Sequence, residues 1–321
     1  MADSEDRLDF DPERMTEPFV DDDYDSRTGY DENFLGISVP MPIVLDPSNV
    51  AEMDGGGGHV IPYEHFSVVM HSGRRIALLT AANVDSNEER KKPEPGPDYS
   101  RRGLSGLGKN DIEKWVTDPR LDAALQLPDR FYTRDRGNFD KGHIVRRDDV
   151  AWGGNYDEIR RANGDTYHVT NCSPQVDAFN RSNLRGEWGK LENFIHKQAK
   201  VEKLCLFAGP VLDDDNDKVF KGKDDQGNVE IQIPSLFWKV VVARNGDRLE
   251  VFGFLLEQDL SDADVEFNVS AEWQGKMIAI SDLEDLVPDL EFADVVRDAD
   301  QVDQSAGEGI RGAGHLERYS H

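Results

Sequence analysis

Two polar motifs that lie close together in the chain narrow the choice of fold more than any other feature. Residues 139–149 read FDKGHIVRRDD, and residues 171–192 begin with NCSPQ and end with WGKLE. The first motif supplies a histidine on a predicted strand, and the second supplies an amide and a carboxylate on a predicted helix. Hydrolysis of a phosphodiester with one hard metal ion requires a base for water and oxygen ligands for the ion. The motifs therefore predict a metal-assisted hydrolytic site shared by a strand and a helix.

These residues resemble the DNA/RNA non-specific endonucleases, the group that includes the Serratia-type nuclease and mitochondrial endonuclease G. The family signature is Asp-Arg-Gly-His on a strand, followed by Ser/Thr-Asn-x-x-Pro-Gln and by a helix carrying Asn-…-Trp-x-x-Leu-Glu. The resemblance extends from about residue 63 to about residue 292. Further blocks match in the same order, at residues 115–119, 208–211 and 233–241.

The resemblance implies an α+β fold of the ββα-metal (His-Me finger) class, with a mainly antiparallel central sheet flanked by helices. Strands followed by one catalytic helix, without regular βαβ alternation, indicate the same class. The resemblance also implies an endonuclease that tolerates any sugar and any sequence, and a homodimer. The implied cofactor is Mg²⁺, for which Mn²⁺ can substitute, and the implied products carry 5′-phosphate and 3′-hydroxyl ends.

Each candidate site residue takes its role from this resemblance. We expect His143 to be the general base, because a pKa near 6.5 lets an imidazole take a proton from water near neutral pH. Asn180 is the expected direct ligand of Mg²⁺, and Glu192 is expected to act on the ion through a bound water. Asp140 is expected to orient the histidine strand or a bound water. Asn171 is expected to brace that strand.

The chain departs from the signature at Lys141, which stands where the family has an arginine. Arginine offers a planar fork to phosphate, whereas lysine is a point charge on a flexible stem. We expect Lys141 to offset charge on the scissile phosphate, with Arg134 or Arg136 supplying the missing fork. Gly142 is expected to provide a special backbone angle or a close approach of phosphate.

The spacing of the two helix residues also departs from the family. The asparagine and the glutamate are usually eight residues apart, whereas Asn180 and Glu192 are twelve apart. At roughly 100° per residue, twelve steps along one continuous helix would turn Glu192 about 120° away from Asn180. We therefore expect an insertion at residues 182–185 and a helix break at Gly186 that resets the phase. Asn183 is the alternative metal ligand.

The net charge of −27 is unusual for a protein that binds nucleic acid, which normally needs a basic surface. The acidic side chains are unevenly distributed along the chain. Residues 101–203 carry 19 basic and 16 acidic side chains, whereas the rest of the chain carries 18 and 48. Nine arginines of the mildly basic segment are expected either to line a groove or to form a salt-bridged surface. They are Arg101, Arg102, Arg130, Arg134, Arg136, Arg146, Arg147, Arg160 and Arg161.

Composition divides the chain into four segments. Residues 1–33 read as an acidic, flexible arm, because too little of this segment is apolar to fold alone. The arm is expected to be a solvated tail, or alternatively to fold over a basic cleft and restrain the enzyme. Residues 34–58 read as a strap and linker, residues 59–296 as the nuclease domain, and residues 297–321 as a flexible tail.

Local patterns predict several elements of the nuclease domain. A hairpin is expected at residues 66–80, a short strand at 167–170, and further strands at 204–208, 237–243 and 250–256. A helix is expected to continue over residues 191–201, and a strand is expected to enter a helix capped by Ser281. Turns are expected at 227–228 and 245–247.

No run of apolar residues is long enough for a membrane span, and the N-terminus has neither a basic start nor an apolar core. The two cysteines, Cys172 and Cys205, are expected to be reduced core residues. These observations predict a cytoplasmic protein. Asp148 and Asp149 are expected to cap and to form salt bridges instead of building a second metal site. The other histidines show no paired metal-ligand spacing, and no zinc site is expected.

Two other function classes remain open at this stage. One is a nucleic-acid-binding module whose Lys141 substitution and helix insertion have weakened or removed catalysis. The other is a phosphodiesterase for small nucleotides, which would need a closed pocket. A non-specific nuclease inside a cell also needs restraint, so we expect an inhibitor or an activating partner, as in a regulated defence or toxin effector.

Overall fold

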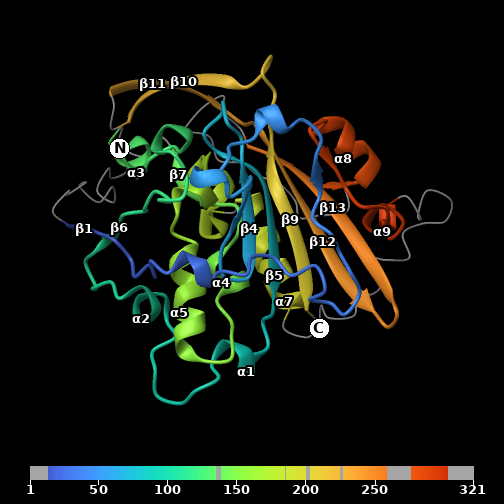
Figure 1. Cartoon of the computed structure of the whole chain (residues 1–321), viewed down its shortest axis with the longest axis horizontal. Helices are drawn as coiled ribbons and strands as arrows, with labels where there is room; N and C mark the ends of the chain where they lie inside the picture. The colour runs from blue at the N-terminus through green and yellow to red at the C-terminus, as the bar shows by residue number, and fades with distance from the viewer. Residues whose placement is uncertain are drawn as a thin grey trace, which may run out of the picture.

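The computed structural model describes residues 14–134, 139–184, 186–199, 203–224, 227–258 and 276–302 (Figure 1). Its centre is a seven-stranded sheet with the order β14-β13-β12-β9-β5-β4-β3, in which every neighbouring pair is antiparallel. The strands are β3 (Val60–Pro62), β4 (Phe66–Met70), β5 (Ala77–Val84), β9 (Leu204–Val211), β12 (Leu236–Asn245), β13 (Arg248–Glu257) and β14 (Met277–Ile278). The expected α+β class with a mainly antiparallel central sheet is confirmed.

The sheet is buried on both faces, and alternation along its strands sends side chains to two different cores. On β12, Phe237 and Val241 join the core that holds Trp188 and Leu191 of α7 (Glu187–Gln198). The neighbouring residues Val240 and Val242 join the opposite core, together with Ile280 and Leu283 of α8. Burial on both faces explains why these strands read as continuous apolar runs in the sequence.

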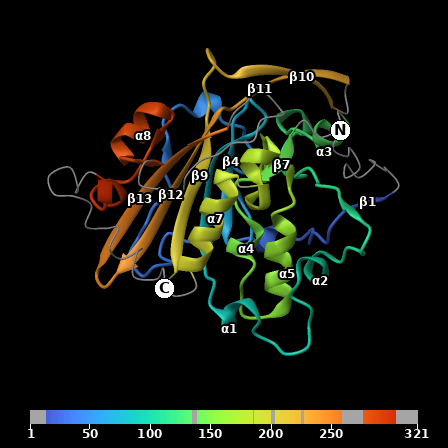
Figure 2. The same cartoon turned by 180° about the vertical axis from the view of Figure 1, so that it is seen from behind.

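Helices cover both faces of the sheet. Figures 1 and 2 place α8 (Ile280–Leu286) and α9 (Asp294–Arg297) at one side, and α4 (Arg147–Val150) and α5 (Tyr156–Asp165) at the other. The remaining helices are short: α1 (Glu88–Lys91), α2 (Arg101–Ser105), α3 (Asp129–Arg134) and α6 (Asp177–Asn180). Four further strand pairs lie outside the main sheet, and two of them, β7–β8 and β1–β6, bear on function. The other two are β10 (Lys218–Asp224) with β11 (Gly227–Ile233), and β2 (Ile43–Val44) with β15 (Leu290–Glu291).

Most of the expected elements are present, and two differ in detail. The hairpin at 66–80 is β4–β5, and the turn at 245–247 joins β12 to β13 with Gly246 at φ 64°. The segment expected as a strand at 167–170 instead leads into a 3-10 turn at Val169–Asn171, and the strand begins at Cys172. The N-cap of α8 is Ala279 instead of Ser281, and Asp300 accepts a hydrogen bond from the amide of Ile280 at 2.7 Å.

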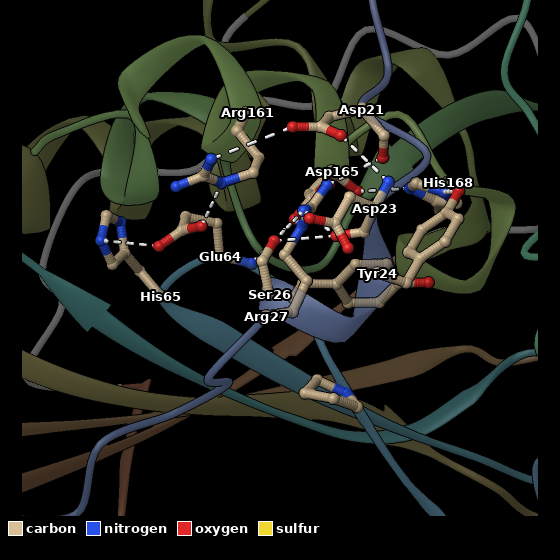
Figure 3. Close-up of polar contacts among 12 residues, drawn as sticks. Asp21, Asp23, Tyr24, Ser26, Arg27, Glu64, His65, Arg161, Asp165 and His168 are labelled. Atoms are coloured by element: carbon tan, nitrogen blue, oxygen red, sulfur yellow. Dashed lines mark hydrogen bonds and ion pairs between the residues drawn. The ribbon is translucent and has the colours of Figure 1, made fainter. Parts of the chain in front are cut away.

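Residues 14–33, expected to be a flexible arm, pack on the domain. Strand β1 (Met15–Thr16) pairs in parallel with β6 (Ile112–Glu113). Further along, the guanidinium of Arg27 pairs with the carboxylate of Asp165 on α5, and both side chains are fully buried (Figure 3). Tyr24 hydrogen-bonds His168 at 2.8 Å. The composition is acidic, but a few side chains anchor the segment; residues 1–13 lie outside the described residues.

The other end of the domain also extends past its expected limit at residue 296. Asp300 is fully buried and bridges to Val251 on β13. Residues 303–321, where a tail was expected, lie outside the described residues. Cys172 and Cys205 are buried and free, as expected. Within the described ranges, no helix is both long and apolar enough to span a membrane.

Candidate active site

The candidate site is built on the antiparallel pair β7 (Asp140–His143) and β8 (Cys172–Gln175). His143 is the last residue of β7 and lies opposite Cys172. Directly before β8, the side chain of Asn171 accepts a hydrogen bond from the amide of Val145 and donates one to its carbonyl, both at 2.9 Å. The backbone carbonyl of Asn171 also accepts the amide of Ile144 at 3.1 Å. These contacts hold the chain that leaves His143 against β8, as expected for Asn171.

His143 lies among aromatic and cationic side chains. The edge of its ring meets Trp115, with 4.4 Å between the ring centroids. Its backbone carbonyl accepts a hydrogen bond from the indole of Trp188 on α7 at 3.2 Å, which ties the end of β7 to the helix. The Nε2 atom of its ring is buried without a hydrogen-bond partner among the described residues.

The protonation state of His143 follows from these surroundings. Burial, and then the positive charges of Arg101 and Arg147, lower the pKa of His143 well below its usual value of 6.5. The negative charge of Asp148 opposes this shift but is a smaller influence. The imidazole is therefore neutral at pH 7 and free to accept a proton.

Asp140 and Asn180 form a second group of contacts at the start of β7. The Nδ2 of Asn180, the last residue of α6, donates to Asp140 Oδ2 at 2.9 Å, and Arg181 Nε donates to the same oxygen at 2.7 Å. Asp140 thus holds Asn180 and Arg181, whereas it was expected to orient the histidine strand or a bound water. With Nδ2 committed to Asp140, the Oδ1 of Asn180 remains as a neutral, hard donor beside a carboxylate, which suits Mg²⁺.

The insertion between Asn180 and Glu192 breaks the helix as expected. Helix α6 ends at Asn180, a 3-10 turn follows at Ser182–Leu184, and α7 begins after its N-cap Gly186. The chain folds back closely, because a Cβ on Gly189 would lie only 2.5 Å from the carbonyl oxygen of Asn180. Asn183, the alternative ligand, is exposed on the 3-10 turn. Of the two asparagines, Asn180 is the one that contacts Asp140.

Glu192 lies deeper than expected. It is buried on α7, one helical turn beyond Trp188, and its Oε1 lies 3.6 Å from the ammonium of the fully buried Lys239. Burial raises the pKa of Glu192 from 4.5 to about 7, against the opposing charges of Lys239 and Arg146. No hydrogen bond or ion pair joins Glu192 to Asn180 or His143 among the described residues. Glu192 was expected to act on the ion through a bound water and not by contact with Asn180, and that role stays a prediction.

The positive charges near His143 also differ from the expected set. The ammonium of Lys141 donates to Asp129 Oδ1 at 2.6 Å and to the carbonyl of Glu113 at 2.7 Å, so it is occupied within the protein. Arg136 lies outside the described residues, as does the side chain of Arg134. The motif did not single out Arg101. The positive charge of Arg101 lowers the pKa of His143, so this arginine acts on the expected base. It is half-exposed at the start of α2 and pairs with Glu113.

Arg101 could not be assigned from spacing, because it lies far from the signature in a polar loop. One local signal was available: Ser100 caps α2 by accepting the amide of Gly103, which fixes the helix that begins at Arg101. The nine arginines do not all line one groove. Arg161 pairs with Glu64, and the guanidinium of Arg160 lies 3.8 Å from the ring centroid of Phe19.

The structure gives a different reason for glycine at position 142, Gly142, from the one expected. Its φ is not in the left-handed region, and a Cβ at this position would lie 2.2 Å from the side-chain oxygen of Gln175 on β8. Gln175 is fully buried, so it cannot move aside into solvent. Glycine is required here because the side chain of Gln175 fills the space above the strand.

Comparison with known proteins identifies the family. Residues 48–299 match the family described as DNA/RNA non-specific endonuclease, which is most of the chain. The chain belongs to the DNA/RNA non-specific endonuclease family.

Two individual proteins are similar to this chain at different levels. A protein of Sinorhizobium fredii (strain NBRC 101917 / NGR234), described as uncharacterized protein y4fB, is 33% identical over 272 residues. That match covers 80% of this chain but only 36% of the relative, so the chain spans about a third of the relative's length. A chain in the crystal structure of the EndoG/EndoGI complex has a TM-score of 0.51 at 16% identity, covering 74% of this chain and 86% of that one. This second likeness shows the fold.

Proposed function

We propose that this chain is an endonuclease that hydrolyses DNA or RNA phosphodiesters, with His143 as the general base and a divalent ion, Mg²⁺, bound by Asn180. The observation that carries the proposal is the placement of His143 at the end of β7, where its ring packs on Trp115 and its carbonyl is tied to Trp188 of α7. Burial and the charges of Arg101 and Arg147 lower its pKa. A base works only when it is unprotonated, and this environment keeps it so at neutral pH. Phosphate contacts carry no sequence information, which agrees with a non-specific substrate range.

The residues of the chain divide the work of hydrolysis. His143 takes one proton from the attacking water as the water oxygen forms a bond to phosphorus and the bond to the 3′-oxygen breaks. Because Nε2 is buried, the proton is accepted at Nδ1, with Nε2 carrying the proton of the neutral ring. Arg101, now paired with Glu113, and Arg147, now paired with Asp148, would turn to the phosphate and offset its charge near His143. A divalent ion held by Asn180 would stabilise the charge that builds on the phosphate and the leaving 3′-oxygen, which takes its proton from solvent.

Asp140 and Asn171 act as positioning residues. Asp140 fixes the amide of Asn180 through Nδ2, which leaves Oδ1 for the ion. Asn171 fixes the segment after His143 through both of its amide atoms. Glu192 supports the same helix from its buried pair with Lys239. We assign Lys141 to the support of β6 and α3 instead of to the phosphate.

Substitution Asn180→Ala is expected to lower metal-dependent cleavage more than about 100-fold, because losing even an outer partner of a metal ligand costs about 10- to 100-fold. Cleavage of plasmid DNA and of a structured RNA, titrated with Mg²⁺ or Mn²⁺ and stopped with EDTA, measures this. The matched control is Asn183→Ala, which removes an exposed amide of the same insertion and is expected to keep activity. Equal activity of the two variants, or cleavage that survives EDTA, would overturn the metal assignment.

A second candidate function is a nucleic-acid-binding module with weakened catalysis. Two observations favour it: the ammonium of Lys141 at the signature position is paired with Asp129, and Glu192 is buried beside Lys239. If the protein retains nucleic acid without cleaving it at any metal concentration, its function is that of a binding module. An endonuclease would instead lose substrate as fragments under the same conditions.

We further propose that the protein is a cytoplasmic homodimer whose activity is restrained by an inhibitor or released by a partner. The chain of similar fold belongs to the EndoG/EndoGI complex, in which EndoG is inhibited, and this supports a protein inhibitor as the class of partner. Restraint by the acidic arm can now be tested only with residues 1–13, because residues 14–33 contribute buried contacts to the fold. Deletion of residues 1–13 should raise cleavage if this segment covers the cleft. Unchanged cleavage and unchanged DNA affinity would exclude that role.

A further inference from the structure

A second cluster of metal-binding side chains lies outside the residues assigned to hydrolysis. Glu64 and His65 lie in the connection between β3 and β4, and Glu158 lies in the first turn of α5. His65 Nε2 lies 3.1 Å from Glu158 Oε1 and 3.6 Å from Glu64 Oε1. The three ligand atoms all lie within 4.8 Å of one another, although Glu64 and Glu158 are far apart in sequence.

Each of the three side chains is held by a further contact that leaves one atom directed at the cluster. Glu158 Oε2 accepts the amide of Gly154 at 2.6 Å, so Oε1 remains. Glu64 Oε2 accepts Arg161 Nε, and Figure 3 shows Glu64 lying between Arg161 and His65. This arrangement is how proteins fix metal ligands, with an outer hydrogen bond that sets the orientation of each one.

Because of the tautomer of His65, all three ligand atoms of the cluster are hydrogen-bond acceptors, and a cation is needed between them. His65 Nδ1 lies 3.0 Å from the carbonyl of Val150, which can only accept, so Nδ1 carries a proton. In the neutral ring, Nε2 is then a lone pair that faces two carboxylate oxygens. Three acceptors directed at one point repel each other unless a cation sits between them. That cation is either a second proton on the ring or a metal ion.

The geometry accommodates a metal ion between the three ligand atoms. Bonds of 2.0–2.2 Å from zinc to nitrogen and oxygen place tetrahedral ligands about 3.3 Å apart. The separations of 3.1 and 3.6 Å from Nε2 bracket this value. His65 also has φ 67°, a left-handed conformation that a non-glycine residue rarely adopts. Its ring stacks on Trp152 with 3.6 Å between centroids, so the strained residue is fixed in place.

We propose that Glu64, His65 and Glu158 bind one divalent transition-metal cation, with Zn²⁺ as the reference ion and water as its remaining ligand. An imidazole with two carboxylates suits zinc or manganese better than Mg²⁺, which prefers an all-oxygen set. The ion joins the β3–β4 connection to α5, so its role is structural. No zinc site was expected from the sequence, because the histidine and Glu158 have no short spacing.

The test uses the full chain, freed of any affinity tag and stripped with EDTA, in an Asn180→Ala background that removes the proposed hydrolytic ligand. Zn²⁺ uptake is measured by calorimetry and by elemental analysis after dialysis. We expect one equivalent, with the midpoint of thermal unfolding raised by the metal. Glu158→Gln should abolish uptake, and Arg161→Gln, which frees Glu64, should weaken it about 10- to 100-fold.

The matched control is His59→Gln, which replaces a histidine outside the cluster and should leave Zn²⁺ uptake unchanged. Absence of stoichiometric uptake by the Asn180→Ala chain would overturn the proposal. Uptake that persists in Glu158→Gln would equally overturn it. Circular dichroism is recorded for every variant. Loss of Zn²⁺ uptake is interpreted only for a variant whose spectrum matches that of the parent.

Discussion

Replacement of His143 by alanine is expected to lower kcat/KM for nucleic-acid hydrolysis by about 10²- to 10⁴-fold, the usual contribution of a general base. The ring of His143 packs on Trp115, and burial lowers its pKa, so the imidazole is unprotonated and can take a proton at Nδ1. Its removal leaves Asn180 and the arginines in place, so substrate and metal should still bind. Initial rates on a fluorescent duplex at saturating Mg²⁺ measure the loss.

The control for this variant is its own nucleic-acid affinity, measured in Ca²⁺ or without metal so that cleavage does not interfere. We expect affinity within a few-fold of the parent, because His143 acts on water instead of holding the backbone. A fall in affinity as large as the fall in kcat/KM would show that His143 serves binding, and would contradict its role as a base.

The pH profile gives a second test of the same residue. The base is active when unprotonated, and its pKa is lowered below 6.5 by burial and by Arg101 and Arg147. As pH falls, kcat/KM should therefore stay level through pH 6.5 and decline only below it. An acid limb centred above 6.5 would contradict this. A limb near pH 7 that disappears in Glu192→Gln would assign the titration to Glu192, whose pKa is raised to about 7.

Substitution Arg27→Met is expected to lower the free energy of unfolding by about 3–5 kcal/mol, because it leaves a buried carboxylate without its partner. Arg27 and Asp165 are fully buried and joined at 2.7 and 3.0 Å. Asp165 would retain only the amide of Glu64 as a donor among these contacts. Urea denaturation followed by tryptophan fluorescence measures the change.

A double variant separates lost packing from the stranded charge. In Arg27→Met/Asp165→Asn, the charge is removed while an oxygen remains to accept the amide of Glu64, so part of the lost stability should return. Lys221→Met, which removes one partner of an exposed ion pair on β10, should change the unfolding free energy far less. Equal effects of Arg27→Met and Lys221→Met would mean that residues 14–33 do not contribute to the stability of the domain.

The fold could be predicted best where burial leaves a local signature. Residues 204–208 and 237–243 are continuous apolar runs because both faces of the sheet are covered, and they become β9 and β12. The segment 14–33 could not be placed in this way. Its acidic composition gives no sign of the ion pair between Arg27 and Asp165, which are 138 residues apart. No local sequence pattern predicts such a contact.

In the candidate site, too, the sequence pointed to some residues and could not show the contacts of others. The motif singled out His143, Asn171 and Asn180, and the helix break at Gly186 followed from helical phase together with the family's eight-residue spacing. The motif could not show that Glu192 points toward Lys239, because that contact depends on how α7 lies on β12. It also could not show that Lys141 is occupied by Asp129, since both belong to segments whose packing is tertiary.

The central claim is that the chain hydrolyses phosphodiesters through His143 with a divalent ion. The most direct measurement incubates supercoiled plasmid with the purified chain and with His143→Ala, each with Mg²⁺ or with EDTA, and analyses the ends of the fragments. We predict fragments with 5′-phosphate and 3′-hydroxyl ends only for the parent chain with Mg²⁺. Intact plasmid in every lane, or fragments made equally by His143→Ala, would contradict the claim.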